Sequence, residues 1–284
     1  MMTVRKDSGI VPDVTVLAKG RSWFPRATSK PQTRLRLFCF PYAGGDALAI
    51  FRKWSEILPS AVEVCPVQIP GRGTRVSEAP IANLASIVKA IGEAIPSYLD
   101  KPFAFFGHSM GAMISFELAR LLRRERGIEP CHLFVSGRKA PQVPCLDPPT
   151  YNLSEPEFLQ ELQRINGTPK EALENLELMR LLLPVLQADF QLCQTYHYTE
   201  ERPLSCPITV LGGLGDETTR EDLEAWRVQT RNLCSLHLLA GDHFFIKTAQ
   251  KELLALISIH LARILSAPGM GLSARFSTLP VSQS

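Results

Sequence analysis

The sequence lacks the features that mark membrane, secreted or nucleic-acid-binding proteins. No apolar run reaches the ~18 residues of a membrane-spanning helix, and the segment before Arg21 has no apolar stretch long enough for a signal peptide. Basic residues form no run interleaved with aromatics, and the formal net charge is only +3. These absences predict a cytoplasmic protein with neither a nucleic-acid nor a membrane partner.

Cysteine pairs at the spacing of a metal site are also missing. The cysteines are scattered and odd in number, and none forms a C-x-x-C pair. This pattern argues against a disulfide framework and against a zinc site. We therefore expect free thiols in a reducing compartment. The cysteines are Cys39, Cys65, Cys131, Cys145, Cys193, Cys206 and Cys234.

What the sequence does contain is an alternation of short apolar runs with longer amphipathic patterns. At 284 residues and 45% hydrophobic, the chain has the material for one large globular domain. The alternation predicts an α/β fold with a mostly parallel central sheet flanked by helices. The expected strands are RLRLFCF, VEVCPVQI, FAFFGHS, CHLFVSG, ITVLGG and SLHLLAG, and helices are expected from Ile81 to Leu99 and from Met110 to Arg126.

One segment breaks this rhythm and sets the expected domain boundaries. Residues 141–203 carry helical patterns without a convincing strand, which predicts a helical insert between core segments 31–140 and 204–266. Inserts at this point of an α/β sheet lie above the strand ends that bind ligands, so we expect a lid. The alternative is a set of packing helices with no gating role. Residues 1–30 are expected to form a flexible extension, and residues 267–284 a disordered tail.

The strongest chemical signal is a serine between two glycines. Gly107 to Gly111 match G-x-S-x-G, directly after the apolar run FAFF and directly before an amphipathic helix. A strand-to-helix turn this sharp strains the backbone at the serine, and the flanking glycines let strand and helix approach. The turn presents the serine hydroxyl at the edge of the sheet, at the positive end of a helix. Ser109 is therefore the predicted nucleophile.

A serine hydroxyl needs a histidine base, and that histidine needs a carboxylate that holds its tautomer. In this fold the expected chain order is serine, acid, histidine. His243, in the sequence AGDHF, is the downstream histidine that falls in a loop just beyond a late strand. His132 and His237 fall inside strand patterns, His260 inside a terminal helix and His197 in the insert, so His243 is the predicted base.

The acid is expected in the loop after the preceding strand, where ITVLGG is followed by Leu214, Gly215, Asp216 and Glu217. Asp216 is the predicted acid, and Glu217 is the second choice within that loop. Asp242 adjoins His243 in sequence, and neighbouring side chains usually point apart, so it is expected to cap the turn. An ordinary exposed aspartate remains the alternative for Asp216.

Acyl transfer also requires backbone donors for an oxyanion. The residue after the nucleophile usually supplies one, and the loop after an early strand supplies the other. Met110 is thus the first predicted donor. The turn from Phe40 to Gly45 has glycines that let the backbone approach a ligand, and Ala43 is the predicted second donor; the alternative is a simple glycine-rich turn.

Five motifs occur in an order that resembles one enzyme family. LFCFPYAGG, the F-x-x-W pattern ending at Trp54, QIPGRGTR, GHSMGA and GDHFF look like those of type II thioesterases. These are stand-alone editing enzymes of polyketide and nonribosomal peptide biosynthesis with the α/β-hydrolase fold. They are related to the medium-chain thioesterases of fatty acid synthesis. The resemblance runs from about Trp23 to about Leu265 and includes the insert.

The resemblance implies that the substrate is an acyl group on the phosphopantetheine arm of an acyl or peptidyl carrier protein. It implies thioester hydrolysis by Ser109, His243 and Asp216, with Ala43 and Met110 as oxyanion donors, no cofactor and no metal. A monomer is expected. Carrier proteins are typically acidic, so basic side chains are candidates for docking a carrier protein. For Arg123, Arg124 and Arg126 the alternative is a basic surface that is merely solvated and binds no partner. The candidates are Arg72, Arg75, Arg123, Arg124 and Arg126.

Two other functions stay open at this point. An oxygen-ester hydrolase would share the fold and the catalytic residues and differ only in its substrate, so family resemblance alone separates the two. A catalytically silent scaffold that binds carrier proteins is a second alternative. It would have no need of Ser, Asp and His in three correctly ordered loops.

Overall fold

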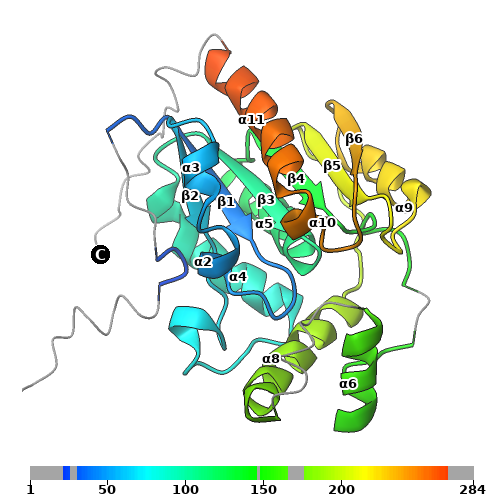
Figure 1. The fold of residues 1–284 in the computed structure, drawn as a ribbon. Coiled ribbons are helices and arrows are strands. Elements are labelled where there is room, and N and C mark those ends of the chain that lie inside the picture. The colour runs from blue at the N-terminus through cyan, green and yellow to red at the C-terminus, as the bar shows by residue number, and fades with distance from the viewer. Residues whose placement is uncertain (1–21, 26–30, 146–147, 166–175, 268–284) are drawn as a thin grey trace, which may run out of the picture.

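A single sheet of six parallel strands forms the centre of the computed structural model (Figure 1). The structure describes residues 22–25, 31–145, 148–165 and 176–267. The strand order is β2-β1-β3-β4-β5-β6, and every neighbouring pair is parallel. The prediction of an α/β fold with a mostly parallel sheet is confirmed. The strands are β1 (Leu35–Phe40), β2 (Val62–Pro66), β3 (Phe103–His108), β4 (His132–Ser136), β5 (Ile208–Gly213) and β6 (Cys234–Leu239).

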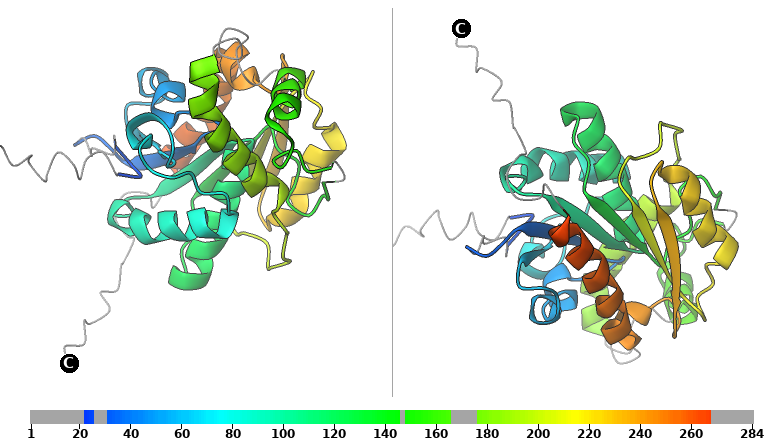
Figure 2. Two further views of the ribbon diagram at one scale, coloured as in Figure 1. Left: turned by 90° about the horizontal axis from the view of Figure 1, so that it is seen from below. Right: turned by 90° about the horizontal axis from the view of Figure 1, so that it is seen from above.

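The apolar strands supply both layers of the core. Successive side chains of a strand point to opposite faces, so Phe38 and Phe105 pack on one side of the sheet and Leu37 and Phe106 on the other. Figures 1 and 2 show α4 and α5 on the first face and α3 and α11 on the second. Because both faces are covered, β1 to β5 are buried along their whole length.

The helix limits follow local signals. α4 (Leu84–Ala94) begins after Asn83, whose side chain accepts a hydrogen bond from the Ser86 amide, rather than at the predicted Ile81. α5 (Met110–Arg126) has the predicted limits and ends at Gly127, which adopts a left-handed φ of 66°. No helix in the described ranges combines the length and apolar character needed to cross a bilayer. The other helices are α2 (Ala47–Ile50), α3 (Trp54–Ile57), α6 (Glu155–Arg164), α8 (Leu176–Gln194), α9 (Arg220–Glu224), α10 (Phe245–Thr248) and α11 (Gln250–Ser266).

Two helices, α6 and α8, lie between β4 and β5 in the chain and side by side at one end of the sheet (Figure 1). They share a small apolar cluster that is separate from the two cores of the sheet, and the rings of Phe158 and Phe190 meet in it with centroids 5.2 Å apart. Residues 166–175, which connect the two helices, lie outside the described residues. In its described part, the insert expected at 141–203 thus contains two helices and no strand of the sheet.

The N-terminal residues that are described pack on the core. Phe24 is buried, and its ring lies 5.3 Å from that of Phe38 and 4.8 Å from that of Tyr98. The backbone carbonyl of Trp23 accepts a hydrogen bond from Gln68. The folded part of the chain therefore begins before the boundary expected at residue 31. The flexibility expected of residues 1–21 and 26–30, and the disorder expected of 268–284, fall outside the described residues.

Candidate active site

Ser109 occupies a strained turn between β3 and α5. Its φ of 54° and ψ of −112° make it the one non-glycine residue with positive φ in the described part of the chain. Two close approaches explain its flanking glycines: a Cβ on Gly107 would lie 2.1 Å from the Gly111 carbonyl oxygen, and one on Gly111 would lie 2.2 Å from that of Phe40. Strain of this kind concentrates at functional sites. The predicted strand, turn and helix around Ser109 are all present.

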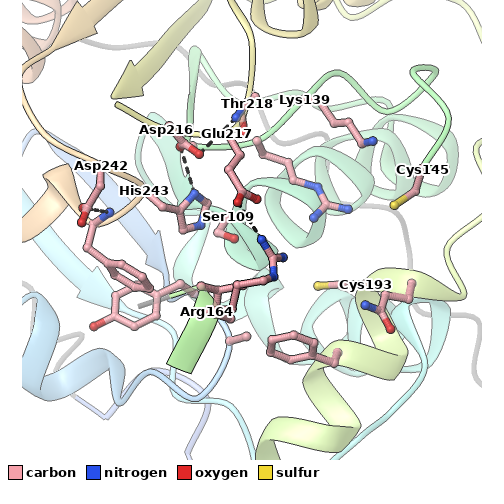
Figure 3. Close-up of a pocket in the computed structure, with 18 of the residues that line it drawn as sticks. Ser109, Lys139, Cys145, Arg164, Cys193, Asp216, Glu217, Thr218, Asp242 and His243 are labelled. Atoms are coloured by element: carbon pink, nitrogen blue, oxygen red, sulfur yellow. Dashed lines mark hydrogen bonds and ion pairs between the residues drawn. The ribbon is translucent and has the colours of Figure 1, made fainter. Parts of the chain in front are cut away.

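The loops after β5 and β6 bring His243 and Asp216 together (Figure 3). His243 Nδ1 donates to Asp216 Oδ2 at 2.9 Å, and the amide of Thr218 donates to Asp216 Oδ1 at 3.2 Å. Burial would raise the pKa of Asp216, but these hydrogen bonds and the His243 ring hold it below its ordinary value. With its proton on Nδ1, the imidazole offers its Nε2 lone pair as a base.

The two alternative acids have other partners. Glu217 is 79% exposed and pairs with Arg164 of α6 at 2.8 Å. Asp242 Oδ1 accepts a hydrogen bond from the Phe244 amide, which caps the turn next to His243. Asp216, in contrast, is only 3% exposed. Of the three carboxylates considered, Asp216 is the one that contacts the His243 ring.

The other histidines lie elsewhere in the fold. His132 on β4 and His237 on β6 each stack near the ring of His260 on α11, with ring centroids 5.2 Å and 6.0 Å apart. This group lies in and beneath the sheet, between the strands and α11. His197 follows α8 and is exposed. None of the four lines the pocket that contains Ser109.

His108, within the serine motif, has a supporting position that sequence analysis did not assign. Its buried ring donates from Nε2 to the backbone carbonyl of His243 at 2.9 Å and accepts at Nδ1 from the Ser136 hydroxyl at 2.8 Å. Burial lowers the pKa of His108 to about 3, so the ring is neutral. It connects the His243 loop to β4. The sequence signal that could have indicated such a role is a polar residue at the end of the otherwise apolar run FAFFG.

The predicted oxyanion donors lie next to this assembly. Met110 is the first residue of α5, where a helix leaves its amides without intrahelical acceptors. Ala43 lies in the Tyr42 to Gly45 turn, which a 2.9 Å hydrogen bond from Gly45 N to Tyr42 O closes. Within the described ranges, neither the Ala43 nor the Met110 amide donates to a protein acceptor. Both amides are therefore free to bind a ligand oxygen.

Ser109, Ala43, Asp216 and His243 line one pocket of about 540 Å³ (Figure 3). Its sheet side is formed by the loops after β1, β4, β5 and β6, and the insert forms the opposite wall. Arg138, which also lines the pocket, has no ion-pair partner in the described residues. No group of three or more metal-ligating side chains occurs in the described ranges. The insert contributes Cys145, Leu162, Arg164, Ile165, Leu186, Phe190, Cys193 and Gln194.

The arginines expected to dock a carrier protein divide into two groups. The expectation is wrong for Arg72 and Arg75, which are buried and hold internal ion pairs with Asp189 and Glu78. Most of their motif, QIPGRGTR, is buried, with Gly73 and Thr74 exposed. A buried guanidinium must be paired. Arg123 and Arg124 both pair with Glu201. Arg124 and Arg126 are exposed.

Comparison with known proteins agrees with this geometry. A family model described as a thioesterase domain matches residues 35–261. The gramicidin S biosynthesis protein GrsT of Aneurinibacillus migulanus is 45% identical over 89% of this chain and 99% of its own length. The solved structure of RedJ, a thioesterase of the prodiginine pathway in Streptomyces coelicolor, is 36% identical with a TM-score of 0.75, and covers 84% of this chain and 98% of its own.

A second solved structure specifies the branch of the family. The type II thioesterase BorB from the borrelidin biosynthetic cluster is 32% identical with a TM-score of 0.76, and the match covers 84% of this chain and 97% of BorB. Fold, serine turn and sequence similarity agree along nearly the whole described chain. The protein belongs to the thioesterase family and is similar throughout its core to the type II thioesterases of nonribosomal peptide and polyketide pathways.

Proposed function

We propose that this thioesterase hydrolyses acyl thioesters on the phosphopantetheine arm of carrier proteins, and that it removes aberrant or stalled acyl units during polyketide or nonribosomal peptide synthesis. The observation that carries the proposal is the Asp216 to His243 hydrogen bond in a pocket that Ser109 also lines. The similarity to GrsT and BorB supports the biosynthetic context.

In the first half of the reaction, Ser109 Oγ attacks the thioester carbonyl carbon while His243 Nε2 takes the hydroxyl proton. Asp216 orients the imidazole and stabilises the imidazolium that forms. The carbonyl oxygen becomes an oxyanion, which the amides of Ala43 and Met110 bind. The carbon–sulfur bond then breaks, and the departing pantetheine sulfur takes the proton from His243.

In the second half, water attacks the acyl-serine ester and gives its proton to His243. A second oxyanion forms at the same amides and collapses, the ester bond breaks, and the proton returns to Ser109 Oγ. The acyl group leaves as a carboxylic acid. Its chain has an apolar surface to lie against, formed by Leu162, Leu186 and Phe190.

The insert is proposed to act as the lid of this pocket. Support comes from its position, because side chains of α6 and α8 line the pocket opposite Ser109. The carrier protein is the proposed partner, and the enzyme is proposed to act as a monomer. We also infer a reducing, cytoplasmic location, which all seven cysteines, as free thiols, support.

The proposal is tested by release of acetate from an acetyl-phosphopantetheinylated carrier protein. Wild type is compared with Ser109→Ala, and acetyl-pantetheine serves as the substrate without a carrier. We expect release that requires Ser109 and has a higher kcat/KM with the carrier than with acetyl-pantetheine alone. Turnover of small oxygen esters without turnover of the carrier-bound thioester would contradict the proposal and favour a general ester hydrolase.

A further inference from the structure

A buried carboxylate ties α8 to the loops after β1 and β2. Asp189 on α8 is 1% exposed, and Arg72, in the loop after β2, is 4% exposed. The two form a bidentate pair, with Arg72 Nη2 donating to Asp189 Oδ1 at 2.7 Å and Nη1 donating to Oδ2. Asp189 Oδ2 also accepts a hydrogen bond from the Gly44 amide at 2.7 Å. One side chain therefore connects three segments that are far apart in the sequence.

Gly44 is the residue after Ala43, so this bond acts directly on the turn that carries the proposed oxyanion donor. Gly44 has a φ of 73° at the third position of the Tyr42 to Gly45 turn, as in a type II turn. The peptide between the second and third residues has opposite orientations in type I and type II turns. Its N–H is the group that Asp189 binds. The carboxylate thus selects one of the two orientations of this peptide, which carries the Ala43 carbonyl. The Ala43 N–H belongs to the preceding peptide, so Asp189 acts on it by fixing the turn that carries it.

Packing around the turn leaves little room for adjustment. A Cβ on Gly44 would lie 2.6 Å from Leu186 Cδ2, and one on Gly71 would lie 3.2 Å from Val185 Cγ2. The turn and the loop after β2 therefore both lie close against α8, in the turn of the helix that precedes Asp189. Arg72 is itself fixed, since its backbone carbonyl accepts a hydrogen bond from Gln68 Nε2 at 2.9 Å.

We propose that Asp189, held by Arg72, is a positioning residue that orients the Tyr42 to Gly45 turn and so aims the Ala43 amide at the oxyanion. This inference rests on the proposed function in that Ser109 is taken as the nucleophile. An oxyanion donor stabilises the transition state only when it is correctly placed, and losing one donor outright costs about 10²- to 10³-fold in kcat. Misplacing one should cost about 10- to 100-fold.

The test uses two double variants that differ in a single property. Arg72→Met with Asp189→Leu removes both charges and the acceptor for Gly44, whereas Arg72→Met with Asp189→Asn removes both charges and keeps an amide oxygen for Gly44. Replacing a buried ion pair as a unit by residues of similar volume often leaves stability unchanged. We therefore expect both variants to fold, which thermal unfolding checks.

The readouts are kcat and KM for acetyl-pantetheine and the affinity for an alkyl trifluoromethyl ketone, which adds to the serine and forms an oxyanion. For the variant with leucine we expect kcat and ketone affinity to fall together, about 10- to 100-fold, with KM little changed. The variant with asparagine should recover most of both. Leu192→Ala, elsewhere on α8, is the control for loosened packing and should lower Tm without changing ketone affinity.

Equal kcat and ketone affinity in the two double variants, both folded, would overturn the inference. If the variant with leucine does not fold, Asp189→Glu decides, because it keeps the charge and moves the carboxylate by one methylene. Unchanged ketone affinity in Asp189→Glu would then overturn the inference. A failure of the proposed function would look different: wild type would not act on carrier-bound acyl groups, or turnover would not depend on Ser109.

Discussion

The two helices of the insert are attached to the core in different ways. α8 is held by the Arg72 to Asp189 pair, whose side chains are almost completely buried. α6 reaches the catalytic loops through Arg164 and Glu217, whose side chains are 56% and 79% exposed. An exposed pair contributes about 0 to 1 kcal/mol, whereas removing one partner of a buried pair costs about 3 to 5 kcal/mol.

This difference assigns separate tasks to the two helices. α8 is part of the framework that positions the site, since it cannot leave without separating a buried charge from its partner. α6 contacts the catalytic loops through an exposed pair, whereas its buried residues Phe158 and Leu162 pack against α8. It can therefore separate from the catalytic loops at low energetic cost as long as it keeps its apolar contacts with α8. We therefore expect any gating of the pocket to come from α6 and to leave α8 in place.

The largest expected difference is in kcat, between variants of the buried carboxylate Asp216 and of its exposed neighbour Glu217. We expect Asp216→Asn to lower kcat by about 10⁴-fold, because an amide cannot hold the required tautomer of His243. Glu217→Gln should change kcat less than about threefold, because it breaks only an exposed ion pair. Steady-state hydrolysis of acetyl-pantetheine measures both. A loss of similar size in Glu217→Gln would mean that the acid has been misassigned.

The next largest difference is expected in stability, between variants that break the Arg72 to Asp189 pair and variants that break the Arg164 to Glu217 pair. We expect Arg72→Met to lower the free energy of unfolding by about 3 to 5 kcal/mol, because it leaves the Asp189 carboxylate buried and unpaired. Arg164→Met should lower it by less than about 1 kcal/mol. Urea unfolding at pH 7 compares them. Similar losses in both variants would show that α6 and α8 are attached equally firmly.

We expect the free energy of unfolding to fall in acid because of the buried side chains of two histidines. Burial lowers the pKa of both His108 and His132 to about 3, while an unfolded histidine titrates near about 6.5. Between these values the unfolded chain binds protons that the folded chain excludes. The stability these residues contribute is thus complete above about pH 6.5 and is lost as pH falls, by up to about 1.4 kcal/mol per pH unit for each.

Denaturant unfolding between pH 7 and pH 4.5 measures this slope. His132→Leu removes one of the two groups and should reduce the slope. The Thr209 hydroxyl, which is hydrogen-bonded to His132 Nε2 at 2.8 Å, keeps a hydrogen-bond partner in Ser235. His197→Gln, at an exposed position, is the matched control and should leave the slope unchanged. A slope that is the same in wild type and His132→Leu would show that His132 does not contribute to the loss of stability in acid.

Much of this architecture could be predicted from local patterns. The apolar runs indicated all six strands, and the glycines around Ser109 indicated its turn, because each signal lies within a few residues of its effect. The candidate triad follows from chain order and from loops that must meet at one edge of a parallel sheet. The pairing of His243 with Asp216 rather than Glu217 agrees with that reasoning.

Contacts between distant segments could not be predicted in this way. Arg72 was a candidate for docking an acidic carrier protein, which requires an exposed side chain. Its partner Asp189 is 117 residues away. His108 occupies the second, unspecified position of G-x-S-x-G and was assigned no role, although its two hydrogen bonds reach β4 and the His243 loop. Burial and pairing of polar side chains depend on tertiary packing, which periodicity does not record.

The smallest expected effect concerns the attachment of α6. Salt screens exposed charges, with a Debye length of about 10 Å at 0.1 M and about 3 Å at 1 M. If the Arg164 to Glu217 pair holds α6 over the pocket, added salt should raise kcat/KM for acetyl-pantetheine by up to about threefold in wild type. This substrate carries no protein surface, so carrier docking cannot account for the change.

In Arg164→Gln, kcat/KM should already be raised at low salt and should no longer respond to added salt. A salt response of the same size in Arg164→Gln would show that other charges hold the pocket closed, and the contrast between α6 and α8 would then rest on stability alone.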